Sequence, residues 1–108
     1  MERLGPAAAP PMSFDVARHD GTATVTVAGE LDISNIDRLD RAVTPIIETR
    51  PRRLVVDISK LRFADSSAIA VWVRWAAEVD EIELRDPSPL LRQVITKMGL
   101  AEKLGLKE

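Results

Sequence analysis

Two adjacent serines that follow an aspartate are the residues of this chain best suited to chemistry. Asp65, Ser66 and Ser67 lie between an apolar segment and a segment with helical periodicity. Asp65 or Ser66 could cap that helix by accepting its first N–H groups, which stabilises a fold by about 1 kcal/mol. Ser66 could instead act as a nucleophile. Its hydroxyl could also accept a phosphoryl group from a partner kinase, because a helix N-terminus tolerates the added charge of about −1.5 to −2.

The remaining composition argues against catalysis by these serines. The chain has no cysteine and a single histidine, His19, so a zinc site or a Ser-His-Asp triad lacks its usual residues. Lys60 lies six residues before Ser66 and is a weak candidate for a general base. No glycine-rich phosphate loop is present. We read His19 as a turn residue, expect no metal or cofactor, and predict that the chain is not an enzyme.

Length and charge restrict the remaining possibilities. A chain of 108 residues forms one domain with one modest core. Its 15 basic and 17 acidic residues include no basic run, which argues against nucleic-acid binding. No apolar stretch is long enough to span a bilayer and no signal peptide is visible, so a cytoplasmic location is expected. Residues 1–12 are rich in Ala and Pro and predict a flexible tail before a domain at 13–108.

Hydrophobic periodicity predicts a small α/β domain. Short strands are expected over 13–17 and 23–29, joined by a tight turn at 20–21 because Asp-Gly favours one. An apolar run predicts a further strand over 54–58, and the alternation of apolar and charged residues predicts another over 82–85. Helical segments between these strands require parallel pairing with crossover connections. The expected order is β β α β α β α, a mixed sheet with helices packed mainly on one face.

The helix boundaries carry recognisable signals. The first helix should begin near Ser34, whose hydroxyl would form a capping box with Asp37. Pro45 predicts a kink or an early end of that helix. The last helix is bounded by Ser88 as N-cap and by Gly99 after its end. Its predicted buried face consists of Leu91, Val94, Ile95 and Met98.

The middle helix, expected over 68–79, contains both tryptophans. Trp72 falls on the apolar stripe and is predicted to lie in the core. Trp75 falls at the edge of the stripe and is predicted to be half-exposed. A less favoured interpretation places Trp75 on a partner or self-association surface, where exposed tryptophan often contributes strongly to binding.

Three sequence motifs together point to a family. Gly29-Glu30-Leu31-Asp32 follows the second strand, the stretch 54–59 leads into Phe63-Ala64-Asp65-Ser66-Ser67, and the stretch 86–89 precedes Met98-Gly99-Leu100. In this order, over residues 13 to 106, they resemble the STAS domain, the family of bacterial anti-sigma factor antagonists. The family commonly has glycine after the two serines, where this chain has Ala68. Alanine favours a helix at that position.

The resemblance implies a protein that works by binding. In the antagonist branch, the unphosphorylated form binds an anti-sigma factor that is itself a serine kinase, which releases a sigma factor. Phosphorylation by that kinase ends the binding. The matching acceptor is Ser66, with Asp65 orienting the loop, Ser67 supporting it, and Asp32 helping to hold the partner. We therefore expect a monomer that is switched off by phosphorylation at Ser66 and contacts neither nucleic acid nor membrane directly.

A second function is open for the same fold. STAS domains also serve as adaptor subunits of membrane transport assemblies, including phospholipid and ABC transporters, and as parts of stress-signalling complexes. In such an adaptor, Ser66 would only cap the helix and there would be no phosphorylation switch. A neighbouring gene for an anti-sigma kinase favours the switch, whereas neighbouring ABC transporter genes favour the adaptor.

Overall fold

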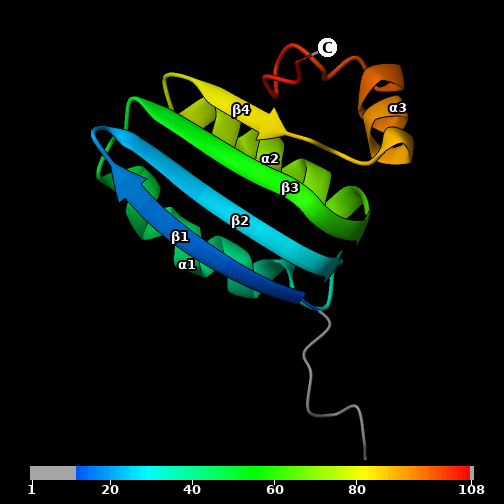
Figure 1. The fold of residues 1–108 in the computed structure, drawn as a ribbon, viewed down its shortest axis with the longest axis horizontal. Helices are drawn as coiled ribbons and strands as arrows, with labels where there is room; N and C mark the ends of the chain where they lie inside the picture. The colour runs from blue at the N-terminus through cyan, green and yellow to red at the C-terminus, as the bar shows by residue number, and fades with distance from the viewer. Residues whose placement is uncertain (1–11, 108) are drawn as a thin grey trace, which may run out of the picture.

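A four-stranded sheet forms the frame of the computed structural model, which describes residues 12–107. Its strands are β1 (Met12–His19), β2 (Thr22–Leu31), β3 (Arg53–Ala64) and β4 (Ile82–Arg85), and they lie side by side in chain order (Figure 1). β1 pairs antiparallel with β2, whereas β2–β3 and β3–β4 are parallel pairs. The predicted mixed sheet is therefore confirmed.

Three helices complete the fold. α1 (Ile36–Glu48) and α2 (Ser66–Glu78) lie together on one face of the sheet, and α3 (Pro89–Lys97) lies beyond the end of β3 (Figure 1). The predicted element order and one-sided helix packing are confirmed. No helix within the described residues is long and apolar enough to cross a membrane.

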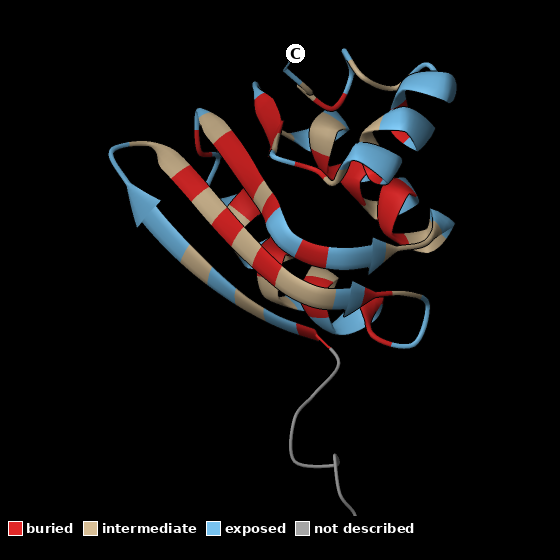
Figure 2. Cartoon of the chain, turned by 45° about the vertical axis from the view of Figure 1, so that its right-hand side comes forward, coloured by how far each residue is buried: buried red, intermediate tan, exposed pale blue. Residues whose placement is uncertain are grey.

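The core lies between the sheet and the α1–α2 layer. Along β2, the buried residues Ala23, Val25 and Val27 alternate with half-buried threonines, as Figure 2 shows by the alternating colours of that strand. This alternation is what a strand with one face against helices requires. The largest fully buried side chains belong to Trp72, Trp75, Met12, Leu31, Leu39, Leu54, Ile58, Leu84, Ile95 and Leu104.

β3 is longer than the predicted strand at 54–58, so residues 61–64 belong to the sheet and not to a loop. Phe63 pairs with Glu30, and Ala64 pairs with Leu31. The β2–β3 register shifts between Thr26 and Ala28 and again between Gly29 and Glu30. Such irregularities break the two-residue repeat of buried positions, which is why the pattern beyond residue 58 did not predict a strand.

The predicted capping box of α1 is wrong. The N-cap is Asn35, with no side-chain cap hydrogen bond, and Ser34 does not pair with Asp37. Pro45 does not end the helix at once, because α1 continues three residues further. Ile47, which is buried in the core, stabilises this last turn despite the N–H that proline lacks.

Both tryptophans of α2 are buried. This confirms the core position of Trp72 and contradicts the half-exposed position predicted for Trp75. The indole N–H of Trp75 donates to Oδ1 of Asp40 on α1 at 2.9 Å. Because α1 covers this side of α2, Trp75 is not available to a partner protein.

α3 has a narrower buried face than the sequence predicts. Ser88 caps the helix, accepting the N–H of Leu91 at 3.2 Å, and Leu91 and Ile95 are buried as expected. Val94 and Met98, predicted to be buried, are exposed. α3 lies past the end of β3 and not over the sheet, so only one side of it meets the core (Figure 2).

The two ends of the described chain lie at the two edge strands of the sheet, β1 and β4. Met12 is buried and begins β1, so the predicted tail boundary at residue 12 is one residue too late. The rest of that predicted tail, residues 1–11, lies outside the described residues. Near the C-terminus, Leu104 is buried and its carbonyl accepts the N–H of Leu84 at 3.0 Å, which covers the free edge of β4.

Candidate functional site

The loop after β2 and the junction between β3 and α2 meet at one end of the sheet. Both follow the carboxyl ends of neighbouring parallel strands, where α/β proteins commonly place ligands and partners. The backbone N–H of Asp65 donates to the carbonyl of Leu31 at 3.1 Å. The N–H of Ile33 donates to Oδ2 of Asp65 at 3.2 Å. These two hydrogen bonds tie the Asp32 loop to the segment that contains the two serines.

Asp65 is the N-cap of α2. Its Oδ1 accepts the hydroxyl of Ser67 at 2.5 Å, the N–H of Ser67 at 2.9 Å and, more weakly, the N–H of Ala68 at 3.4 Å. The Ser67 hydroxyl is the main cause that lowers the pKa of Asp65, and the backbone N–H groups of Ala68, Ile33 and Ser67 lower it further against the opposing effect of burial. Asp65 is therefore a carboxylate at neutral pH. The sequence allowed either Asp65 or Ser66 as the N-cap, and the structure shows that it is Asp65.

The two serines differ in their surroundings. Ser66 is the first residue of α2 and its side chain is exposed. Within residues 12–107, its hydroxyl has no hydrogen-bond partner in the protein, whereas the hydroxyl of Ser67 is engaged by Asp65. Another protein can therefore reach the oxygen of Ser66, and the oxygen of Ser67 serves the fold.

Ala68, at the position where the resemblance leads one to expect glycine, fits its surroundings. It is buried within α2. The non-glycine residues with positive φ in the described chain are Asp20, Arg50 and Asp86. Since Ala68 is not among them, its backbone conformation does not require glycine.

Asp32 stands in the other loop of this end. Its Oδ1 accepts the N–H of Ser34 at 2.9 Å and the Ser34 hydroxyl at 2.5 Å. The N–H of Asp32 donates to Asn35 Oδ1 at 3.0 Å, and the Asn35 amide donates to the carbonyl of Glu30 at 2.9 Å. These bonds connect residues between positions 30 and 35 to one another. The four residues singled out from the sequence lie in two hydrogen-bonded segments: Asp32 in the loop after β2, and Asp65, Ser66 and Ser67 at the start of α2.

Sequence reasoning missed the apolar side chains that surround this end. Ile33 follows Asp32 in the loop after β2 and is exposed. Phe63, three residues before Ser66, is also exposed. So is Leu90 on α3. Helical periodicity gave no signal for Leu90, because adjacent residues of one helix, such as Ala68 and Ile69 of α2, can both be buried.

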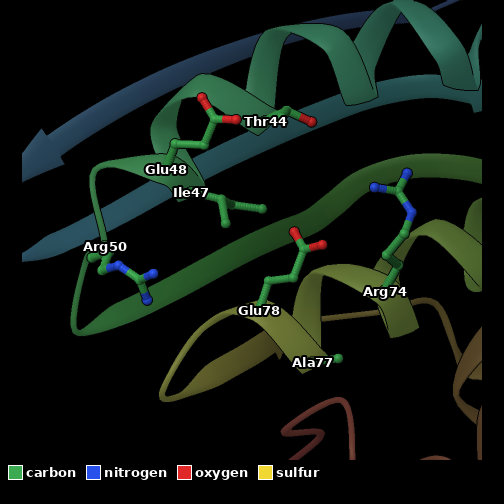
Figure 3. Close-up of a pocket in the computed structure, with 7 residues that line it drawn as sticks. All are labelled: Thr44, Ile47, Glu48, Arg50, Arg74, Ala77 and Glu78. Carbon is green, nitrogen blue, oxygen red and sulfur yellow. The ribbon is translucent and has the colours of Figure 1, made fainter.

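A cavity of about 470 Å³ lies elsewhere, between α1 and α2 (Figure 3). It is lined by Thr44, Ile47, Glu48, Arg50, Arg74, Ala77 and Glu78. Apart from Arg50, which follows α1, these residues come from the C-terminal halves of the two helices. Ser66 begins α2, so the cavity and the serine lie at opposite ends of that helix. Among the described residues, no three His, Cys, Asp or Glu side chains gather as a metal site.

The fold and this end of the sheet have counterparts among known proteins. A family model described as "Mlab, STAS domain" matches residues 14–106. The chain belongs to the STAS domain family. This confirms the resemblance found in the sequence, and the match covers nearly the whole of the described chain.

The curated relatives that match the chain include antagonists of an anti-sigma factor. The anti-sigma-F factor antagonist RsfB of two Mycobacterium tuberculosis strains is 28% identical over 60 residues, which is 56% of this chain and 49% of RsfB. The chain therefore spans about half the length of the curated relatives it matches.

Solved structures show the same fold. An anti-sigma factor antagonist from Mycobacterium paratuberculosis superposes with a TM-score of 0.78 at 26% identity, covering 89% of this chain and 86% of the other. The antagonist SpoIIAA is 22% identical in two forms. Its unphosphorylated form gives a TM-score of 0.74 over 83% of this chain and 84% of its own. Its phosphorylated form, from Bacillus, gives 0.69 over 83% and 86%.

Proposed function

We propose that this STAS domain is an anti-sigma factor antagonist that is controlled by phosphorylation of Ser66. In its unphosphorylated form it binds an anti-sigma factor that is also a serine kinase, and a sigma factor is released. The observation that carries the proposal is the exposed, unpartnered hydroxyl of Ser66 at the start of α2, in a segment bonded to the Asp32 loop. We further propose that the protein is a cytoplasmic monomer that contacts neither nucleic acid nor membrane.

Phosphate at Ser66 would act on the complex more than on the domain. The first turn of α2 lies at the positive end of the helix dipole, which tolerates a phosphate. A partner docked over Ser66, by contrast, would have to accommodate about two further negative charges beside the ionised Asp65. The phosphate would also lose water on burial in the interface, and this cost weakens the complex.

Each neighbouring residue has a separate part in this mechanism. Asp65 fixes the first turn of α2 and the Asp32 loop through its two carboxylate oxygens. Ser67 holds Asp65 in place. Asp32, half-buried and bonded to Ser34, presents a carboxylate on the same surface to cationic groups of the partner. The partner kinase supplies the nucleotide, and this chain supplies the acceptor oxygen.

The test uses purified anti-sigma kinases of the source bacterium, ATP and mass spectrometry of the modified peptide. Wild-type protein is expected to gain one phosphate on Ser66 and to dissociate from its kinase. Ser66→Ala is expected to stay bound in the presence of ATP, and Ser66→Glu to bind poorly. Ser59→Ala is the matched control, because it removes an exposed hydroxyl outside the Asp65 contacts and leaves Ser66 and Ser67 intact. Phosphorylation of Ser66→Ala at the wild-type level would overturn the assignment, and an unmodified, ATP-insensitive complex would favour the adaptor.

A further inference from the structure

An apolar groove lies beside the Ser66 segment, between the end of β3 and the start of α3. Its volume is about 250 Å³, and residues 61–64 line one side while Ser88, Leu90, Leu91 and Val94 line the other. We refer to this feature as the α3 groove. The groove is continuous in sequence with the proposed phosphorylation site, because residue 64 is two positions before Ser66.

Three of the residues that line the groove, Phe63, Leu90 and Val94, are large apolar side chains open to solvent, and Met98 follows Val94 by one helical turn. Leu90 is 71% exposed, Phe63 52%, Met98 51% and Val94 39%. Leu90, Val94 and Met98 follow one another at intervals of four residues, so they form a single stripe along α3. In the described part of the chain, Ile33 at 75% is the other exposed large hydrophobic residue, and it lies in the loop bonded to Asp65. Apolar side chains gathered in this way commonly mark a protein contact.

The segments on both sides of the groove are basic. Residues 59–64 and 89–97 contain Lys60, Arg62, Arg92 and Lys97, and the acidic residues that flank these segments include Asp65 and Asp86. The side chain of Arg62 is 73% exposed, and its guanidinium is 3.8 Å from the carboxylate of Glu30. A partner that fits this surface therefore carries acidic residues beside apolar ones. A symmetric pair of two copies is disfavoured, because a two-fold contact would place these basic segments against each other.

We propose that the α3 groove is a second docking site for the anti-sigma kinase, which inserts the apolar face of an amphipathic helix flanked by Asp or Glu side chains. This inference rests on the proposed function, because it assigns one partner to both the Ser66 surface and the groove. The groove is not modified by phosphorylation. It contributes affinity and orientation, while Ser66 determines whether the complex persists. Helix-in-groove binding of this kind uses anchors at intervals of three and four residues.

The test compares two variants of the same helix that change the charge equally. Leu90→Asp places a carboxylate in the groove, and Gln93→Asp places one at an exposed position of α3 that does not line it. Binding to each purified anti-sigma kinase of the source bacterium is measured by titration calorimetry with ADP, so that no phosphate is transferred. Leu90→Asp is expected to weaken binding about tenfold or more, as for a central interface residue, and Gln93→Asp less than about twofold. Circular dichroism verifies that both variants are folded.

A charge variant keeps the proposal falsifiable if Leu90→Asp fails to fold. Arg62→Glu lies on the opposite side of the groove, and it is expected to weaken binding more at low salt than at high salt. Wild-type affinity in a folded Leu90→Asp, or in Arg62→Glu, overturns the groove as a docking site. If Ser66→Glu still abolishes binding in that case, the proposed function stands without the groove.

The oligomeric state and the kinase panel decide whether the groove has a different occupant. If sedimentation shows that the wild-type chain is a dimer and that Leu90→Asp is a monomer, the occupant is a second copy and the proposal is overturned. If no kinase of the panel binds or phosphorylates the wild-type chain, the proposed function fails, and this inference fails with it. Protection of residues 89–97 from hydrogen exchange in the kinase complex, absent with Leu90→Asp, supports the groove.

Discussion

The carboxylate of Asp65 accepts the backbone N–H of Ile33 at 3.2 Å, across 32 positions of the chain. One side chain therefore caps α2 and holds the loop that contains Asp32. The Asp32 loop and the Asp65 segment are separate motifs in the sequence, and this contact brings them together on one surface. The first two predictions test the hydrogen bonds that Asp65 makes in this surface.

Asp65→Ala should destabilise the domain and loosen the Asp32 loop. The variant loses the cap of α2, which typically costs about 1 kcal/mol in the free energy of unfolding. It also loses the acceptor of the Ile33 N–H, so that amide should exchange faster with solvent. Urea unfolding and hydrogen exchange measure the two effects. Asp37→Ala is the control, since Asp37 is an exposed carboxylate of the first turn of α1. Unchanged exchange at Ile33 would show that the carboxylate does not hold the loop.

Ser67→Ala should raise the pKa of Asp65 toward its ordinary value. The Ser67 hydroxyl is the main cause of the lowered pKa in the folded protein. A carboxyl whose pKa is lower in the folded than in the unfolded state adds stability above its unfolded pKa of about 3.9. That stability is lost as the pH falls through the folded pKa.

The titration of Asp65 can be followed directly by NMR of its carboxyl carbon. The wild-type protein should titrate at lower pH than Ser67→Ala, and the stability difference between the two should shrink as the pH falls below about 4. Ser66→Ala is the matched control, because the hydroxyl of Ser66 does not contact Asp65 among the described bonds. Equal titration in wild type and Ser67→Ala would contradict the geometry.

Asp40→Ala should destabilise the contact between α1 and α2. Burial alone would raise the pKa of Asp40, but hydrogen bonds from Trp75, Arg74 and Thr44 lower it overall. Removing the carboxylate leaves the buried indole N–H of Trp75 without its acceptor, which costs about 2 kcal/mol. Denaturant unfolding measures the loss. In the Trp75→Phe background, the same substitution should cost clearly less, and an equal cost would mean that the indole bond does not matter.

Gly105→Ala should be much more damaging than Gly99→Ala. Both glycines have positive φ, 66° and 75°, so both substitutions meet the strain of about 1 to 2 kcal/mol that a side chain brings to this conformation. At Gly105 a Cβ would also lie 1.8 Å from the carbonyl oxygen of Ile82, whereas at Gly99 nothing lies within 4 Å. Thermal unfolding of the two variants compares the costs. Similar melting temperatures would show that the C-terminal segment does not pack against β4 as described.

The sequence was sufficient to predict the order of elements and the position of the serines. Local signals determine both: alternation in β2, the cap at Ser88, and a strand followed by Asp65 at a helix start. The burial of Trp75 was not predictable in this way. It depends on Asp40, 35 positions away, and therefore on how α1 and α2 pack together.

The surface around α3 was not predictable for a related reason. The positions of Leu90, Val94 and Met98 fit an apolar stripe, and periodicity alone does not tell whether a sheet covers that stripe. The irregular register of β2 and β3 likewise concealed the strand that extends to Ala64. Both features are decided by long-range pairing, which a single sequence does not display.

The hydrogen bond between Ser67 and Asp65 limits the number of hydroxyls that can be modified at this surface. The hydroxyl of Ser67 is bonded to the N-cap of α2, and the neighbouring side chain of Ser66 is exposed to solvent. A modifying enzyme would therefore find one free hydroxyl at this surface, although the sequence contains two serines. A phosphate added to that free hydroxyl would change the charge beside Asp65 in a single step.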